Sequence, residues 1–278
     1  MSDLTNLLSS NFFRKQRLLD DFHIKYENPK YWIWLCDLYD DWLNQKEFTQ
    51  IVPKRIHQIW LGSPLPKKYR SYQKSWQEHN PDFEYKLWSE EDILALDLFN
   101  KNQFVASKNF GVKSDIARYE ILYRFGGIYA DTDFECLKSF DEKFLSRSFL
   151  AGQVFSYSPQ MANGLIAAAP KDNFLKLIIE NLPKYPGEMK PMDVLQYCGP
   201  IFISDLAWKH CESLTDFLVL PSQYFYPWPN YKRNQTADRY SWSTEDTTAI
   251  HHWETSWVRN GLVTKLKSIL KNYKGVSK

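Results

Sequence analysis

The spacing of apolar residues along the chain changes near residue 50. Before that point Leu4, Leu7, Leu8 and Phe12 recur at helical spacing, and residues 31–48 form a second run rich in Trp and Leu. Such spacing gathers apolar side chains on one face of a helix. We therefore expect residues 1–50 to be a helical extension that packs on a main domain of residues 51–278. A role for the extension in binding an acceptor or a partner stays open.

After residue 53 the pattern alternates between strand and helix periods. Residues 55–60 alternate with a period of two, residues 67–79 follow as a helix, and residues 83–88 form a second strand. Strands that alternate with helices are typical of an α/β fold with parallel neighbouring strands. We expect further strands at 149–155, 161–169, 217–220 and 248–253, and further helices at 112–125, 171–182, 203–211 and 259–273.

Two aspartates follow the helix predicted at 112–125. Gly126-Gly127 ends that helix, with Ser114 or Asp115 in its first turn, and a short apolar strand then leads to Asp131-Thr132-Asp133. On an extended backbone alternate side chains point the same way, so both aspartates would project to one side. Close carboxylates repel unless a positive charge lies between them. Mg²⁺ and Mn²⁺ prefer oxygen ligands, so the pair indicates a site for a metal and a diphosphate. A solvated turn is the alternative.

Three further residues are candidates because of where they lie on predicted strands. Trp60 ends the first strand, and ligands gather at the carboxyl ends of strands in open α/β sheets. His57 has the opposite strand parity, and we expect it to be structural. His251 and His252 are adjacent on the last strand, so they face opposite ways and at most one can reach the metal. An imidazole beside two carboxylates suits Mn²⁺.

Composition narrows the class of protein. The net charge of +2 does not favour nucleic-acid binding. The four cysteines form no CxxC pair, and residues 1–10 lack the features of a signal peptide, so we expect a cytoplasmic protein with reduced thiols. No apolar run approaches the roughly 20 residues that span a bilayer. The lysines of the predicted helix 259–273 could contact an anionic membrane peripherally, or could be the solvated face of a docked helix.

Four stretches of sequence together resemble glycosyltransferase family 32. They are Val52–Trp60, Lys113–Tyr119, Gly126–Asp133 and Ala249–Trp257, and the resemblance covers about residues 52–257. It implies a GT-A fold, which is a Rossmann-like nucleotide-sugar transferase domain with a mixed, mainly parallel sheet. The family includes bacterial capsular and lipopolysaccharide sugar transferases and fungal mannosyltransferases. The catalytic domains of clostridial glucosylating toxins are more distant relatives.

The resemblance also implies roles for individual residues. Asp131 and Asp133 match the metal and diphosphate pair, and His251 is favoured over His252 as a further metal ligand. Asp115 and Arg118 match a pair that grips hydroxyls of the donor sugar, although a surface salt bridge would show the same spacing. The other matching positions are Trp60 at the nucleotide base, Tyr129 near the donor, Asn163 and the Gly199-Pro200 turn lining the site, and Ser256 and Trp257 over the diphosphate. A core position is the alternative for Trp60 and for Tyr129.

The resemblance, together with the aspartate pair, implies a retaining, metal-dependent glycosyltransferase that uses Mn²⁺ or Mg²⁺. It would move a hexose from a UDP- or GDP-sugar to a glycan, a lipid-linked glycan or a protein, in the synthesis of capsule, lipopolysaccharide or another surface polysaccharide. The alternatives are a toxin-like protein glycosyltransferase and a non-catalytic protein that binds sugar nucleotides. A phosphatase of the aspartyl-phosphate type is disfavoured by Glu135, which stands where that class has Thr or Val.

Overall fold

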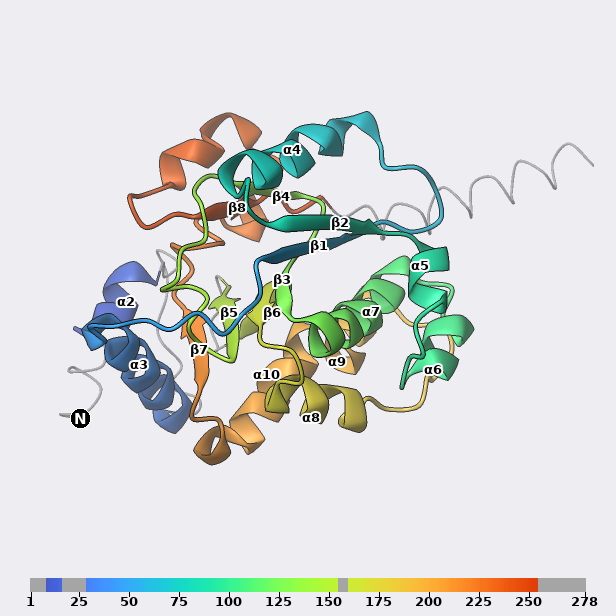
Figure 1. Cartoon of the computed structure of the whole chain (residues 1–278), viewed down its shortest axis with the longest axis horizontal. Helices are drawn as coiled ribbons and strands as arrows, with labels where there is room; N and C mark the ends of the chain where they lie inside the picture. The colour runs from blue at the N-terminus through green and yellow to red at the C-terminus, as the bar shows by residue number, and fades with distance from the viewer. Residues whose placement is uncertain (1–8, 17–28, 155–159, 255–278) are drawn as a thin grey trace, which may run out of the picture.

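A six-stranded sheet forms the centre of the computed structural model, which describes residues 9–16, 29–154 and 160–254 (Figure 1). Its strand order is β2-β1-β3-β6-β5-β7. The strands are β1 Arg55–Ile59, β2 Glu84–Trp88, β3 Gly127–Ala130, β5 Phe149–Gln153, β6 Met161–Ala168 and β7 Phe217–Leu220. β6 is antiparallel to both its neighbours, and the other neighbouring strands are parallel. The mixed, mainly parallel sheet expected of this α/β fold is confirmed.

A second, two-stranded sheet brings the far end of the described chain back to the aspartate pair. In it β4 (Phe134–Cys136) runs antiparallel to β8 (Ala249–His251), with Phe134 opposite His251. β8 is shorter than the strand predicted at 248–253, and β4 was not predicted. A three-residue strand is too short to show a period, and its partner lies more than 100 residues later in the sequence.

Helices cover the sheets on several sides, and most lie where the apolar spacing predicts them. They are α2 Asn11–Lys15, α3 Pro29–Asn44, α4 Arg70–His79, α5 Glu90–Leu94, α6 Lys101–Ala106, α7 Phe110–Phe125, α8 Asn173–Asn181, α9 Pro191–Tyr197 and α10 Pro200–Lys209. α7 packs on β3 and β6, α8 packs on α7, and α4 packs on β4. α6 and α9 were not predicted. The helix predicted at 259–273, together with Ser256 and Trp257, lies outside the described residues.

The ends of α7 follow from local chemistry. The side chain of Asn109 caps its first turn by accepting the N–H groups of Gly111 and Val112. Its last turn ends at Gly126, where φ is 60° and an added Cβ would lie 2.7 Å from Cδ of Pro170. Because α7 begins at Phe110, Asp115 lies in the second turn, and its predicted place in the first turn is wrong.

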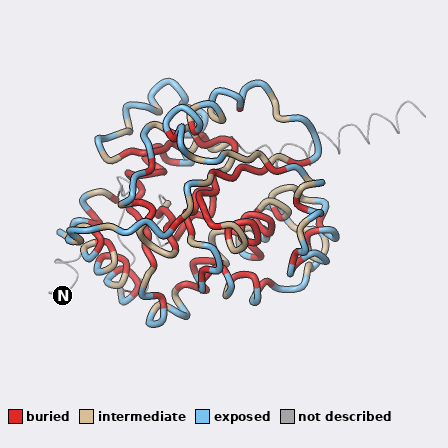
Figure 2. The backbone as a smooth tube through the Cα atoms, viewed as in Figure 1, coloured by how far each residue is buried: buried red, intermediate tan, exposed pale blue. Residues whose placement is uncertain are grey.

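The N-terminal helices share the core of the rest of the protein. Phe12 and Trp32 are buried in the same cluster as the sheet, which fills the centre of Figure 2. The hydroxyls of Tyr39 and Tyr224 are 2.8 Å apart and hydrogen-bonded. The predicted packing of a helical segment before residue 50 is therefore present. The division of the chain into two domains at residue 50 stays a prediction.

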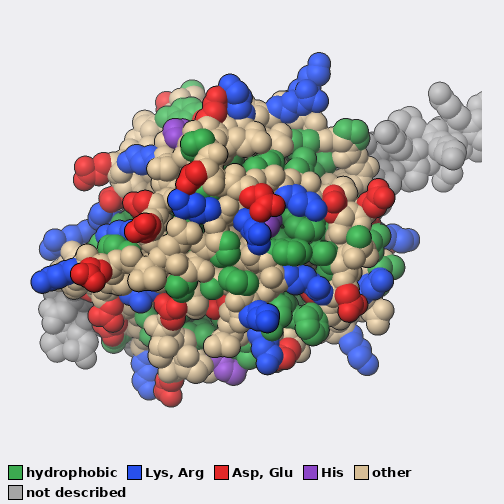
Figure 3. All heavy atoms as spheres, viewed as in Figure 1, with side chains coloured by type: hydrophobic (Ala, Val, Ile, Leu, Met, Phe, Trp, Pro, Cys, Tyr) green, Lys and Arg blue, Asp and Glu red, His purple; other side chains and the backbone are tan. Residues whose placement is uncertain are grey.

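The surface agrees with the small net charge. On the face seen in Figure 3, acidic and basic side chains are interspersed. Within the ranges that the structure describes, none of the helices combines the length and the apolar character needed to cross a bilayer.

Candidate functional site

A cleft of about 560 Å³ opens beside the carboxyl ends of β1 and β3. These strands are parallel neighbours, so their ends meet at one edge of the sheet, where open α/β sheets bind ligands. The predicted site residues that line the cleft are Trp60, Asp115, Arg118, Tyr129, Asp131, Asp133, Asn163, Pro200 and His251. The structure thus brings together residues from six separate segments of the chain.

The aspartate pair lies in a turn between β3 and β4. The N–H of Asp131 donates to the carbonyl of Gly164 at 2.8 Å, and the N–H of Phe134 donates to the carbonyl of Asp131 at 2.9 Å. The predicted strand up to Asp133 is therefore wrong, because β4 leaves the central sheet to pair with β8 and the chain must change direction. The two carboxylates still face a common point, as predicted. The cause is the turn, and not the alternation of side chains along a strand.

Asp131, Asp133 and His251 form a cluster that can hold a metal ion. Each offers one ligand atom, and these atoms lie within 4.8 Å of one another. Nε2 of His251 is 3.1 Å from Oδ1 of Asp133, and the N–H of Glu254 donates to Oδ2 of Asp133 at 2.7 Å. His252 points away from this cluster, toward Glu135. The structure therefore places His251, and not His252, beside the aspartates.

Electrostatics and space both fit a divalent cation at this cluster. Burial raises the pKa of Asp131, and Asp133 raises it further, although the nearby Arg118 opposes the shift. Burial also acts on Asp133, but His251 and the Glu254 N–H outweigh it and lower the pKa of that carboxyl. A Cβ at Gly164 would lie 2.8 Å from Oδ2 of Asp131, so glycine leaves that oxygen room. Two carboxylates and an imidazole are suitable ligands for Mn²⁺ or a similar ion.

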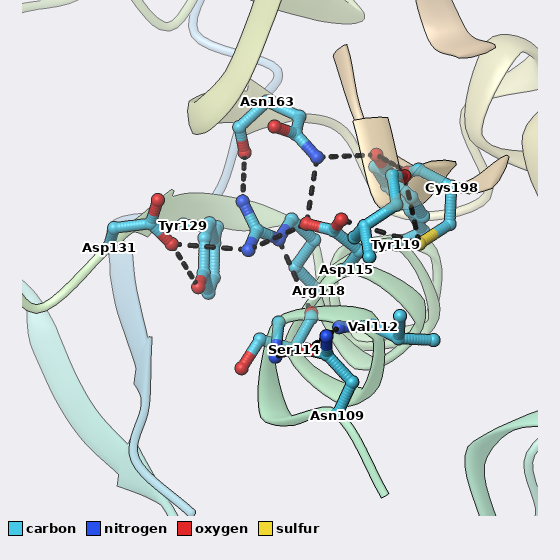
Figure 4. A network of polar contacts seen from close by, with 12 residues as sticks. Asn109, Val112, Ser114, Asp115, Arg118, Tyr119, Tyr129, Asp131, Asn163 and Cys198 are labelled. Carbon is cyan, nitrogen blue, oxygen red and sulfur yellow. Dashed lines mark hydrogen bonds and ion pairs between the residues drawn. The ribbon is translucent and has the colours of Figure 1, made fainter. Parts of the chain in front are cut away.

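Arg118 joins the two halves of the site (Figure 4). Its Nη2 lies 2.9 Å from Oδ1 of Asp115 and 3.2 Å from Oδ1 of Asp131. Its Nη1 donates to the carbonyl of Asn163 at 2.5 Å, and its Nε donates to the carbonyl of Ser114 at 3.3 Å. Two guanidinium N–H groups are thus hydrogen-bonded to main-chain carbonyls, and Nη2 forms ion pairs with both carboxylates. The ion pair is buried, which excludes the surface salt bridge considered from the sequence.

Asp115 lies at the end of this network, facing the cleft. It also accepts hydrogen bonds from the Asn163 amide at 2.9 Å and from the Cys198 thiol at 3.3 Å. Burial raises the pKa of Asp115 to about 6, with Arg118 opposing the shift. Tyr129 belongs to the same network. Its hydroxyl donates to Oδ1 of Asp131 at 2.7 Å, and its ring centroid lies 4.5 Å from Cζ of Arg118. Tyr129 is thus both a buried aromatic and a neighbour of the metal cluster.

The aromatic side of the cleft is formed by residues that follow β1. Trp60 is half-buried, lies 5.0 Å from Tyr69 between ring centroids, and donates from Nε1 to the Ser63 hydroxyl. It is therefore not a fully buried core residue, and its role at a nucleotide base stays a prediction. Phe110, the first residue of α7, also lines the cleft and was not singled out from the sequence.

Two further contributors were missed by reasoning from the sequence. Gly164 could have been noticed, since a glycine inside a strand often marks a close approach of another group. Glu254 acts through its main-chain N–H, which no residue type reveals.

Comparison with known proteins places these residues in a family. Residues 66–150 match the family model described as "Glycosyltransferase sugar-binding region containing DXD motif". The chain is 31% identical over 228 residues to inositol phosphoceramide mannosyltransferase 1 of Schizosaccharomyces pombe, covering 76% of this chain and 68% of that protein. It is 27% identical over 235 residues to inositol phosphoceramide mannosyltransferase 3 of the same organism, covering 77% of this chain and 64% of that protein.

Among solved structures, the PaToxG glycosyltransferase is similar with a TM-score of 0.48 and 17% identity, covering 68% of this chain and 82% of that one. The family model spans Asp115, Arg118, Asp131 and Asp133, which lie together in the cleft. The chain therefore belongs to the family of glycosyltransferases whose sugar-binding region contains a DXD motif.

Proposed function

We propose that the protein is a metal-dependent glycosyltransferase that moves a hexose from a nucleotide-diphosphate sugar to a hydroxyl acceptor. The observation that carries this proposal is the convergence of Asp131, Asp133 and His251 in one cleft, with Asp115 tied to them through Arg118. A solvated turn would not bring an imidazole from a distant strand to both carboxylates.

The cleft suggests an order for the parts of the donor. Trp60 lies on the side where we place the nucleotide base, and Asp115 and Asn163 lie where we place the sugar. The diphosphate would then lie between them, at Asp131, Asp133 and His251. Mn²⁺ or Mg²⁺ bound there would neutralise charge on the departing diphosphate. Asp115 accepts hydrogen bonds from the sugar hydroxyls in this arrangement and so orients the reacting carbon.

Retention of configuration is part of the proposal. The bond between the anomeric carbon and the diphosphate oxygen breaks, and the acceptor oxygen bonds to the same face of that carbon while its proton passes to the departing diphosphate. A covalent route would need a free carboxylate nucleophile. Asp115 and Asp131 are both engaged by Arg118, which supports direct attack from the face of departure. The anomeric configuration of the product, measured by proton NMR, tests this step.

The relatives suggest the sugar and the acceptor. Two of them are named as mannosyltransferases acting on inositol phosphoceramide, so we propose mannose as the sugar and a lipid-linked hydroxyl as the acceptor. A capsule or lipopolysaccharide glycan and a protein are the other acceptors that the sequence suggests. A lipid acceptor would bring the enzyme to a membrane surface. We propose that the basic segment 259–273 makes this contact, on the cytoplasmic side.

A ligand screen followed by a transfer assay tests this function. Thermal unfolding is measured with UDP, GDP and their sugars, each with and without Mn²⁺. A specific donor raises the melting temperature by mass action, and we expect the largest rise with GDP-mannose and Mn²⁺ together. Transfer is then assayed to inositol phosphoceramide, to a polysaccharide fragment and to protein. If no sugar nucleotide raises the melting temperature and none is hydrolysed, the proposed activity is wrong.

A further inference from the structure

Next to the metal cluster, a second group of side chains surrounds His252. It consists of Glu135 on β4, Tyr72 on α4, and Arg239 and Tyr240 on the 3-10 helix η4 (Thr236–Trp242). We call these four residues and His252 the His252 anchor. None of them is among the described residues that line the cleft. The catalytic proposal above assigns them no role.

The anchor is a polar network in which both ring nitrogens of His252 have a partner, and this fixes the proton arrangement. Nη1 of Arg239 is 2.8 Å from Nδ1 of His252, and because a guanidinium only donates, Nδ1 must accept. The ring proton is therefore on Nε2, which donates to Oε2 of Glu135 at 2.9 Å. The Tyr240 hydroxyl donates to the same carboxylate oxygen at 2.8 Å. A negative carboxylate and a positive guanidinium are thus joined through a neutral imidazole.

Packing also restricts the orientation of the His252 imidazole. The ring of Tyr72 is stacked on His252 with centroids 4.3 Å apart and planes 13° apart. His252 is only 4% exposed. With a partner at each ring nitrogen and a ring stacked on its face, His252 restrains the segment that carries it. The segment in this case is the end of β8 and the residues that follow it.

That segment wraps around Asp133. The main-chain N–H of His252 donates to the carbonyl of Asp133 at 2.9 Å, and strand alternation sends His251 to the metal side. Trp253 then has a φ of 54°, which is rare for a residue with a bulky side chain. This turn brings the N–H of Glu254 to Oδ2 of Asp133 at 2.7 Å.

A strained residue persists only where its surroundings hold it in place. On one side of Trp253 the chain is held by the His252 anchor. The side chain of Trp253 is also held, because its Nε1 donates to the carbonyl of Trp228 at 2.8 Å. Release of the anchor would let the turn relax, and both His251 and the Glu254 N–H would then move relative to Asp133.

We propose that Glu135 and Arg239 are positioning residues for the metal site. Acting through His252, they hold His251 and the Glu254 N–H against Asp133. The candidate ligands Asp131, Asp133 and His251 are therefore already arranged before a cation binds. This inference rests on the proposed metal-dependent function. Substitution of residues that orient metal ligands without binding the metal typically lowers metal affinity by about 10- to 100-fold.

The test is the dissociation constant of Mn²⁺ for the full chain without donor, measured by electron paramagnetic resonance, together with the melting temperature of the metal-free protein. Glu135→Gln and Arg239→Met should raise that constant by about 10- to 100-fold. Arg239→Lys keeps a charged donor and should lie closer to the wild type. Tyr240→Phe removes one hydroxyl at a half-exposed position, so it should fold and raise the constant by less.

Glu120→Gln is the matched control. Glu120 is also a buried glutamate, and it accepts the N–H groups of Phe99 and Asn100 away from the metal cluster. This variant should lower the melting temperature and leave Mn²⁺ affinity unchanged. If the wild type binds Mn²⁺ and the anchor variants bind it equally well, or lose no more than the control, the positioning role is wrong. If the wild type itself binds no Mn²⁺, the metal-dependent function is wrong and the inference fails with it.

Discussion

At the scale of single residues, the role of Arg118 differs from the one that its spacing from Asp115 suggests. The i, i+3 spacing predicts its pairing with Asp115. It gives no sign that Asp131 is a second partner, or that the carbonyls of Ser114 and Asn163 take two more N–H groups. Arg118 therefore acts mainly as the positive charge that lets the buried carboxylate of Asp115 and the half-buried carboxylate of Asp131 lie near each other.

Substitution at the two members of this pair should have different consequences. Asp115→Asn should lower sugar transfer by on the order of 10²-fold, because misplacement of the reacting carbon by about 1 Å costs that much. Nucleotide binding should change little, since Asp115 lies at the sugar end. Calorimetry with GDP or UDP alone, set beside transfer rates, measures both. Normal turnover in Asp115→Asn would show that this carboxylate does not hold the sugar.

Arg118→Ala should instead destabilise the fold. Removal of one partner from a buried ion pair typically costs about 3–5 kcal/mol, because the other charge stays buried and unpaired. Asp115 would be left in that state, and the half-buried Asp131 would lose its positive neighbour. Chemical denaturation of the metal-free protein measures the loss, with Arg118→Lys as the control that keeps the charge. An Arg118→Ala variant as stable as the wild type would contradict this role.

The two adjacent histidines can be separated by their response to metal. His251→Ala removes a ligand, whereas His252→Ala removes only the anchor that holds the ligand in place. We therefore expect both variants to need more Mn²⁺ than the wild type for half-maximal activity. The requirement should be larger in His251→Ala than in His252→Ala. Activity measured against Mn²⁺ concentration gives the order. A larger requirement in the His252 variant would reverse the assignment.

At the scale of elements, those with a clear apolar period were predictable and short ones were not. α7 and the strands β5 and β6 follow from the sequence because each presents several apolar side chains to the core. α6 buries only Phe104, so it shows no stripe. α9 was missed because it begins with Pro191, and a proline was interpreted as part of a loop. Proline is also favoured at the first helical position.

Strand β1 carries a histidine that should make stability depend on pH. Trp88 donates from Nε1 to Nδ1 of His57 at 3.1 Å, so the proton lies on Nε2, which donates to the Gly126 carbonyl at 2.9 Å. This is the structural role predicted for His57. Burial lowers its pKa from 6.5 to about 4. The unfolded state therefore binds the proton more tightly, and stability is lost as pH falls from about 6.5 to 4.

The expected loss from His57 is up to about 3 kcal/mol across that range. His57→Gln removes this titration and leaves the other groups in place. Urea unfolding of both proteins at several values of pH between 7 and 4 measures the difference. The wild type should lose more stability than the variant as pH falls, and parallel pH profiles would contradict the account.

At the scale of the whole molecule, the site depends on chain segments that meet only after folding. The family motif indicated which residues belong together, and the structure shows how they do so. β8 returns beside β4 to bring His251 to Asp133, and β6 brings Asn163 and Gly164 to α7 and to the turn that holds Asp131. Contacts of this length leave no local period in the sequence. The His252 anchor was invisible for the same reason, since its members come from four distant segments.

The most direct test of the account is donor hydrolysis by the wild type and Asp133→Ala, with and without Mn²⁺. Asp133 contacts His251 and the Glu254 N–H, so its loss removes a ligand and the group that organises the others. We predict that the wild type releases sugar from its donor only when Mn²⁺ or Mg²⁺ is present, and that Asp133→Ala remains folded but releases none. Mn²⁺-dependent turnover retained in Asp133→Ala, or equal turnover by the wild type with and without metal, would contradict the account.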